Sequence, residues 1–172
     1  VSRLNEALLA VSDWGVANLV TFNATKTQAC LFSAKRSSFH PAPTFQNALI
    51  PLTDNLHILG VELTSKLNFG PYIESKAKIA AKKLGILSKV RRYFTSEQLL
   101  QLYQAQVRSC MEYCCHLWDG SAKYQLAALD SVEKRAKKII CDPELTDAKL
   151  QSLDHRRRVA RLSVFYRLHF GE

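Results

Sequence analysis

The sequence changes its periodicity at one point, the stretch from Asn68 to Pro71. Before it lie three of the five prolines and weakly alternating apolar residues, a pattern typical of loops and short strands. After it, apolar residues recur at three- and four-residue steps, and a proline in the first turn favours a helix that begins there. We therefore predict a mainly α fold with a small β portion (α+β), divided into domains 1–70 and 71–172.

The first domain contains one helical pattern and several strand-like runs. Residues 4–14 repeat apolar side chains at helical steps, which predicts an amphipathic helix that stops at Gly15. The positions expected on its buried side are Leu4, Ala7, Leu8, Val11 and Trp14. Residues 28–33 and 57–63 predict strands, and the polar loop between them contains a further short strand-like run at residues 44–49.

Residues 71–92 form the pattern with the strongest bearing on function. One side of the predicted helix is apolar, with Ile73, Ala77, Ala80, Leu84 and Leu87. At 100° per residue, Lys78, Lys82 and Lys89 lie about 140° to 180° from the first of these. Lys76, Lys83, Arg91 and Arg92 add positive charge, and Glu74 is the only acid in the range. Solvated faces usually mix both signs, so this face predicts contact with a phosphate backbone, with a plain solvated surface as the alternative.

Three more helices are predicted after residue 92, and Thr95 with Gln98 forms a capping box at the start of the first. The buried side expected for that helix is Leu100, Tyr103, Val107, Cys110, Cys114 and Leu117. The next buries Leu126, Leu129, Val132, Ala136, Ile139 and Ile140, with Lys134, Arg135, Lys137 and Lys138 on its outer side. The last begins near Thr146 and has Leu150, Leu153, Val159, Leu162 and Phe165 on its apolar side.

Two clusters in these helices are candidate sites. The arginines Arg156, Arg157, Arg158 and Arg161 predict either a nucleic-acid contact or a nuclear localisation signal. The residues Cys110, Cys114, Cys115 and His116 suggest zinc, but a zinc site needs about four converging ligands and these point to different sides of one helix. Cys110 and Cys114 are therefore interpreted as small buried apolar residues, and no metal site is predicted.

Composition and charge limit the class of protein. With 47% hydrophobic and 23% charged residues the chain has an ordinary globular composition. A net charge of +9 favours a polyanionic partner over an acidic small substrate, although many soluble proteins are equally basic. Five cysteines without a secreted-type framework indicate a reducing compartment, and no apolar run approaches the roughly 20 residues that span a bilayer. The chain begins without methionine or signal peptide, so we expect a fragment of a longer intracellular protein, nuclear and cytoplasmic, with no membrane partner.

Several weak motifs occur together in a recognisable order. Trp14 is followed after eight residues by Asn23, then after two by Lys26-Thr27, a predicted strand, a loop and Leu59-Gly60-Val61. The helical part adds Leu102-Tyr103 through Arg108, Glu112-Tyr113, Trp118, Leu129 through Ala136, and Ile139-Ile140. Together these segments, from about Leu4 to Gly171, resemble the C-terminal palm and thumb segment of reverse transcriptases from non-LTR retrotransposons, the jockey-like LINE elements.

The resemblance implies roles for particular residues. Lys26 would correspond to the lysine of the palm's fourth motif, where a general acid can protonate departing pyrophosphate. The plainer interpretation is that Asn23 caps a turn and Lys26 is solvated. Leu59, Gly60 and Val61 would form a primer-grip-like hairpin, although a buried strand with a glycine bulge explains them equally well. Domain 1–70 would be the end of the palm, and 71–172 a helical thumb or connector that grips a primer-template duplex beside the upstream palm and fingers of the parent chain.

Catalysis by such a polymerase needs paired carboxylates that bind magnesium, and no two aspartates of this chain are adjacent. We expect no cofactor in this fragment, magnesium in the complete polymerase, no small-molecule cofactor, and no polymerase activity from the fragment alone. Three hypotheses remain open at this point. The chain is a polymerase fragment, a free-standing basic nucleic-acid-binding remnant without catalysis, or a structural protein-interaction domain.

Overall fold

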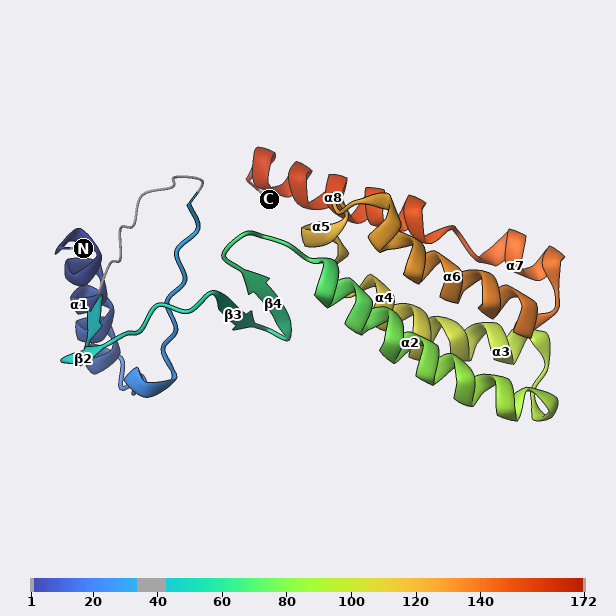
Figure 1. The fold of residues 1–172 in the computed structure, drawn as a ribbon, viewed down its shortest axis with the longest axis horizontal. Coiled ribbons are helices and arrows are strands. Elements are labelled where there is room, and N and C mark those ends of the chain that lie inside the picture. The colour runs from blue at the N-terminus through green and yellow to red at the C-terminus, as the bar shows by residue number, and fades with distance from the viewer. Residues whose placement is uncertain (1, 34–42, 172) are drawn as a thin grey trace. The chain divides into compact units, whose positions relative to one another are not determined.

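The computed structural model of the chain describes residues 2–33 and 43–171, which form two compact units divided between Asn68 and Phe69 (Figure 1). Helices account for most of the described residues. The strands among these residues form two short antiparallel hairpins. The predicted fold class, mainly α with a small β portion, is confirmed.

The first unit is built around one helix and the two hairpins. Its elements are α1 (Ser2–Ala17), the 3-10 helix η1 (Ala24–Lys26), the hairpin of β1 (Thr44–Phe45) and β2 (Ala48–Leu49), and the hairpin of β3 (Asn55–Ile58) and β4 (Val61–Thr64). The ring of Phe22 lies between Trp14 and Phe45, with centroids 6.4 Å and 5.9 Å away. Phe45, Ile50 and Val61 are buried, so this unit has a small core.

Three expectations for the first unit are wrong. The helix does not stop at Gly15, since α1 continues to Ala17; an added Cβ at Gly15 would lie 2.6 Å from the ring of Phe22, so glycine permits this close approach. Residues 28–33 form no strand beyond a single parallel bridge from Ala29 to Leu52. Residues 57–63 are not one strand, because Leu59 and Gly60 adopt positive φ values of 49° and 75° and turn the chain between β3 and β4.

The apolar side of α1 is also not buried as expected. Leu4, Val11 and Trp14 are exposed in the described residues. The physical reason is the short length of the strand that packs on α1. This strand, β1, is two residues long. A strand of that length covers a small part of an apolar stripe that extends over three turns.

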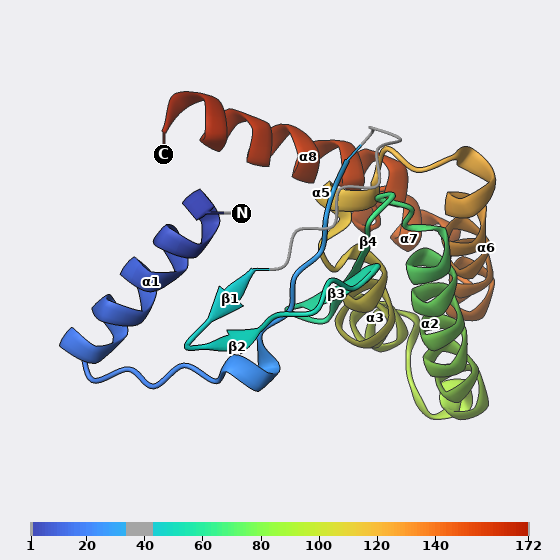
Figure 2. The ribbon, with the colours of Figure 1, turned by 60° about the vertical axis from the view of Figure 1, so that its left-hand side comes forward.

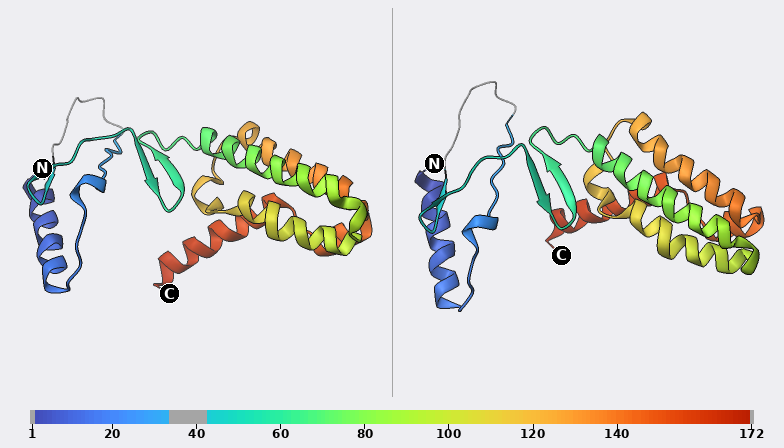
Figure 3. Two further views of the ribbon diagram at one scale, coloured as in Figure 1. Left: turned by 90° about the horizontal axis from the view of Figure 1, so that it is seen from below. Right: turned by 60° about the horizontal axis from the view of Figure 1, so that its bottom comes forward.

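The second unit is a helical bundle. Its elements are α2 (Gly70–Val90), the 3-10 helix η2 (Arg91–Tyr93), α3 (Ser96–Leu102), the π-helical segment η3 (Tyr103–Arg108), α4 (Ser109–Glu112), α5 (Cys115–Trp118), α6 (Lys123–Ile140), α7 (Pro143–Lys149) and α8 (Leu153–Phe170). The helix α2, the α3–α4 rod and α6 lie side by side (Figures 2 and 3), and α2 packs most extensively on α6. The start of α8 packs on α4 and α5.

Local signals account for most of the helix boundaries in this unit. Thr95 and Gln98 form the predicted capping box, with reciprocal side-chain to backbone bonds. The single helix predicted from Thr146 is instead two, because α7 ends at Lys149 and Ser152 caps a new helix by accepting a bond from the backbone N–H of His155. The apolar residues thus recur on both sides of Ser152, but the N-cap at Ser152 divides the predicted helix in two.

The predicted buried side of residues 100–117 is correct up to Val107 and wrong beyond it. The wider turns of η3 take up one additional residue, which rotates the following helix relative to a regular 3.6-residue repeat. The first position buried after the segment is Met111, one residue later than the predicted Cys110. The chain then leaves the helix at Cys114, which adopts a positive φ of 52°, and the separate helix α5 buries Cys115 and Trp118 in place of the predicted Cys114 and Leu117. Cys110 and Cys114 are half-buried, so their interpretation as buried apolar residues is corrected in favour of Cys115.

Candidate nucleic-acid interface

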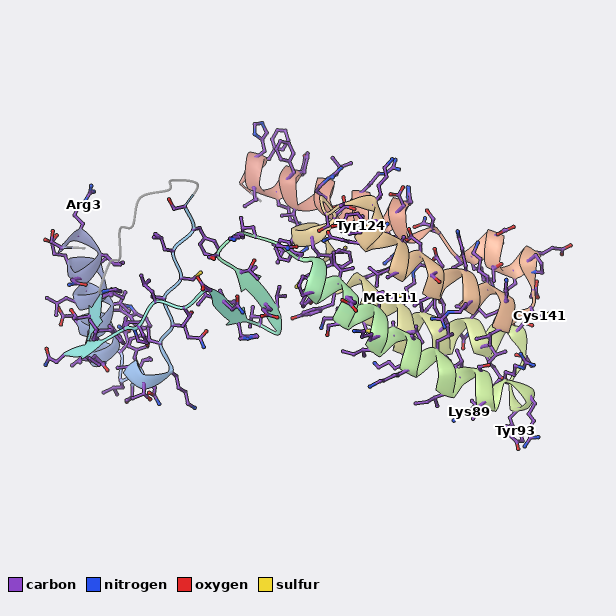
Figure 4. All side chains as sticks on the ribbon, viewed as in Figure 1. Arg3, Lys89, Tyr93, Met111, Tyr124 and Cys141 are labelled. Carbon is purple, nitrogen blue, oxygen red and sulfur yellow. The ribbon has the colours of Figure 1, made fainter. Side chains whose placement is uncertain are left out.

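The helix α2 separates an apolar side from a basic side as its sequence predicts. Its apolar positions Ile73, Ala77, Ala80, Leu84 and Leu87 are all buried. Lys78, Lys82 and Lys89 are exposed on the other side. At 1.5 Å per residue they are separated along the axis by about 6 Å and about 10 Å. Figure 4 shows Lys89 at the far end of this helix, near Tyr93.

The basic side of α2 has little internal neutralisation. The one acid in the helix, Glu74, accepts a bond from Lys78 at 2.7 Å, and this hydrogen bond and the lysine charge lower the pKa of Glu74. Both side chains are exposed, so water and salt weaken the pair. Lys82 and Lys89 form no ion pair with any part of residues 2–33 or 43–171. A polyanion can therefore approach these lysines without first breaking buried contacts.

The remaining cations of this segment lie on the edges of the basic side. Lys76 is half-buried, with its ammonium group 4.9 Å from the ring centroid of Tyr72 and 5.4 Å from that of Tyr113. Lys83 is also half-buried and lines an apolar hollow of about 290 Å³ beside η3. Arg91 and Arg92 are exposed, and Arg92 donates to the Tyr93 hydroxyl at 2.7 Å.

The arginines of the α8 cluster form ion pairs within the unit. Arg156 donates two bonds to Glu112, at 2.6 Å and 2.8 Å. Arg158 pairs with Asp154, and Arg161 with Asp119 at 2.9 Å. Every arginine of the predicted cluster thus has a carboxylate partner. In the lysine row of α2, by contrast, only Lys78 is paired with an acid of the described residues.

Arg157 in particular is not available to a partner. Its side chain is 2% exposed and lies within 3.5 Å of Asp119 and 3.3 Å of Asp130. The expectation that Arg157 faces a phosphate backbone is therefore wrong in this fold. It is a buried ionic contact that joins α8 to α6 and to the end of α5.

The basic surface extends to a helix that the site prediction left out. Lys134, Arg135 and Lys138 are exposed on α6, whereas Lys137 pairs with Asp147 at 3.3 Å. Lys138 and Arg91 line the same hollow, of about 340 Å³, where α2 and α6 end side by side. The sequence did predict that these cations lie on the outer side of a helix. It did not predict that this helix packs beside α2, because that depends on residues far apart in the chain.

The candidate residues of the first unit are on two separate turns. Lys26 is exposed at the end of η1, where Asn23 Oδ1 accepts bonds from the backbone N–H groups of Thr25 and Lys26, as the capped-turn interpretation describes. In the β3–β4 hairpin, Leu59 is 84% exposed at the tip and Val61 is 2% exposed at the start of β4. Leu59 and Val61 therefore have opposite environments.

Neither metal binding nor membrane insertion has a candidate in the described part of the chain. Within residues 2–33 and 43–171, no three His, Cys, Asp or Glu side chains are grouped so that they could hold a metal ion. In the same residues no helix combines the length and apolar character that crossing a membrane needs. Comparison with protein families, curated proteins and solved structures finds no match.

Proposed function

We propose that this chain is the C-terminal palm and thumb segment of a non-LTR retrotransposon RNA-directed DNA polymerase, and that α2 grips the backbone of a primer-template duplex. The observation that supports this function is the exposed row of Lys78, Lys82 and Lys89, with one acid in the same helix. The opposite side of α2 is occupied by the bundle core, so the lysine side is the one free to meet a partner.

In this proposal the lysines bind by charge and do not read sequence. Each ammonium group that neutralises a phosphate releases counterions, and the backbone is the same for every base. In this proposal the paired carboxylates that bind magnesium belong to the upstream palm of the parent chain. The exposed lysine row also supports a second candidate, a basic nucleic-acid-binding module without catalysis. In a complete polymerase we assign Lys26 to protonation of the leaving pyrophosphate.

The test replaces Lys78, Lys82 and Lys89 with glutamine and measures binding to a primer-template duplex at several salt concentrations. Loss of three phosphate contacts should reduce the slope of log affinity against log salt by roughly 2 to 3. The matched control replaces Arg3, Lys66 and Lys123, three exposed cations outside α2, and removes the same net charge. An unchanged slope in the α2 variant, or an equal change in the control, would contradict the proposal.

A further inference from the structure

A polar cavity lies on a part of the bundle that the duplex-binding proposal does not use. It has a volume of about 580 Å³ and is bounded by η3, α4, the end of α7 and the start of α8. Its polar lining includes Gln104, Arg108, Ser109, Glu112, Lys149 and Arg156. Ligand sites in proteins commonly range from about 300 to 1,000 Å³, so the cavity is large enough for a small ligand.

A buried guanidinium group forms part of the cavity wall. Arg108 is 5% exposed and belongs to the π-helical segment η3, a kind of segment that is frequent at functional sites. Its Nε donates to Glu112 Oε1 at 2.6 Å, and its Nη2 donates to the backbone carbonyl of Gln151. These bonds do not involve Nη1. A desolvated cation of this kind is costly to bury unless nearby negative charge compensates it.

The side chains that line the cavity carry less negative charge than positive charge. Both oxygens of Glu112 are engaged, Oε1 by Arg108 and Arg156 and Oε2 by Arg156. Burial acts to raise the pKa of Glu112, but the hydrogen bonds from Arg156 and Arg108 lower it overall, so this carboxyl remains ionised. Three cations and one carboxylate therefore line the cavity, which leaves an excess of two positive charges.

Two carboxylates outside the lining, Glu133 and Glu97, offset part of this excess. Glu133 Oε1 lies 3.9 Å from Arg108 Nη2, beyond hydrogen-bond distance, and burial raises the pKa of Glu133. Lys149 pairs with Glu97 at 3.2 Å, but both side chains are exposed, so the lysine can leave this pair at little cost. Two backbone carbonyls nearby already accept bonds, that of Lys149 from Gln104 and that of Gln151 from Arg108.

We propose that this cavity binds a phosphate group, held by the guanidinium groups of Arg108 and Arg156 and by the ammonium group of Lys149. Each guanidinium group has five N–H donors, and two of them donate in the bonds described above, so the donors of Nη1 and the second N–H of Nη2 can bind phosphate oxygens. A doubly negative phosphate balances the excess charge of the lining. The group is either free phosphate or the terminal phosphate of a nucleic-acid strand. The proposal does not depend on duplex binding by α2.

The experiment titrates the full chain with inorganic phosphate while chloride keeps the ionic strength constant, and records the melting temperature. A ligand that binds the folded state raises this temperature in a saturable way. Lys149→Gln should weaken phosphate binding about tenfold, the effect of losing one hydrogen bond to a charged group. Arg156→Lys keeps the charge but loses the paired donors, and it should weaken binding similarly. Neither change removes a core side chain, so both variants are expected to fold.

Lys123→Gln, which removes the same charge from an exposed position at the start of α6, should leave phosphate affinity unchanged. The triple glutamine variant of Lys78, Lys82 and Lys89 should also bind phosphate normally, which separates this site from the duplex-binding face. Oligonucleotides with and without a 5′-phosphate distinguish the two sources, since a terminal phosphate would compete with inorganic phosphate. Absence of saturable stabilisation, or equal effects of Lys149→Gln and Lys123→Gln, would overturn the proposal.

Discussion

Replacement of Arg157 by alanine is predicted to destabilise the helical unit far more than replacement of its neighbour Arg158. Arg157 is buried, and its loss leaves Asp119, itself 6% exposed, with Arg161 as its remaining partner. Arg157 Nε lies 3.5 Å from Asp119 but forms no hydrogen bond, so the contact is mainly coulombic. Breaking a buried ion pair costs about 3 to 5 kcal/mol, and we expect the lower end because Arg161 remains.

Arg158 provides the matched comparison on the same turn of α8. It pairs with Asp154, and both side chains are exposed, so Arg158→Ala should cost no more than about 1 kcal/mol. Against a total stability of roughly 5 to 15 kcal/mol for a domain, the two losses are easily distinguished. Equilibrium urea unfolding of the full chain, followed by far-ultraviolet circular dichroism, measures both free energies of unfolding.

The reasoning fails if the two variants lose equal stability, since burial would then not matter at position 157. Nucleic-acid binding provides a second readout, in conditions where both variants are folded. Because Arg157 is not accessible, the salt slope of Arg157→Ala should equal that of the parent chain. A slope reduced by about one would show that Arg157 contacts a phosphate after all.

Three further predictions concern other parts of the chain. Burial raises the pKa of Glu133, so the folded state retains this proton to higher pH than the unfolded state. Wild type should therefore lose stability relative to Glu133→Gln as pH rises from about 4.5, and a difference in unfolding free energy that stays constant across urea titrations at several pH values would contradict this. Gly85 is exposed within α2 with nothing within 4 Å of an added Cβ, so Gly85→Ala should stabilise by about 1 kcal/mol in urea unfolding, and a loss would show unseen strain. The isolated chain should give no template-dependent nucleotide incorporation, and with an upstream palm Lys26→Ala should slow the single-turnover rate more than it weakens primer binding; an unchanged rate excludes the general-acid role.

The sequence by itself determined the features that depend on neighbours within a few residues. The apolar and basic sides of α2 follow from residue spacing, because side chains three and four apart share one side of a helix. The capping box at Thr95 follows from the residue three positions later, and the start of α2 follows from a proline that fits the first turn. The exposure of Lys78, Lys82 and Lys89 is a consequence of the same local geometry.

Tertiary structure decided the features that depend on distant partners or on departures from regular geometry. The arginine cluster of α8 has the same charge signal as α2, but its use depends on carboxylates such as Glu112, 44 residues away from Arg156. The π-helical turns of η3 moved the next buried position to Met111, and a break at Cys114, which adopts a positive φ of 52°, starts the separate helix α5 in which Cys115 is buried. Ion pairs and helix register of this kind depend on how the helices pack, since the energy of a buried charge is set by every group around it and not by its neighbours in sequence.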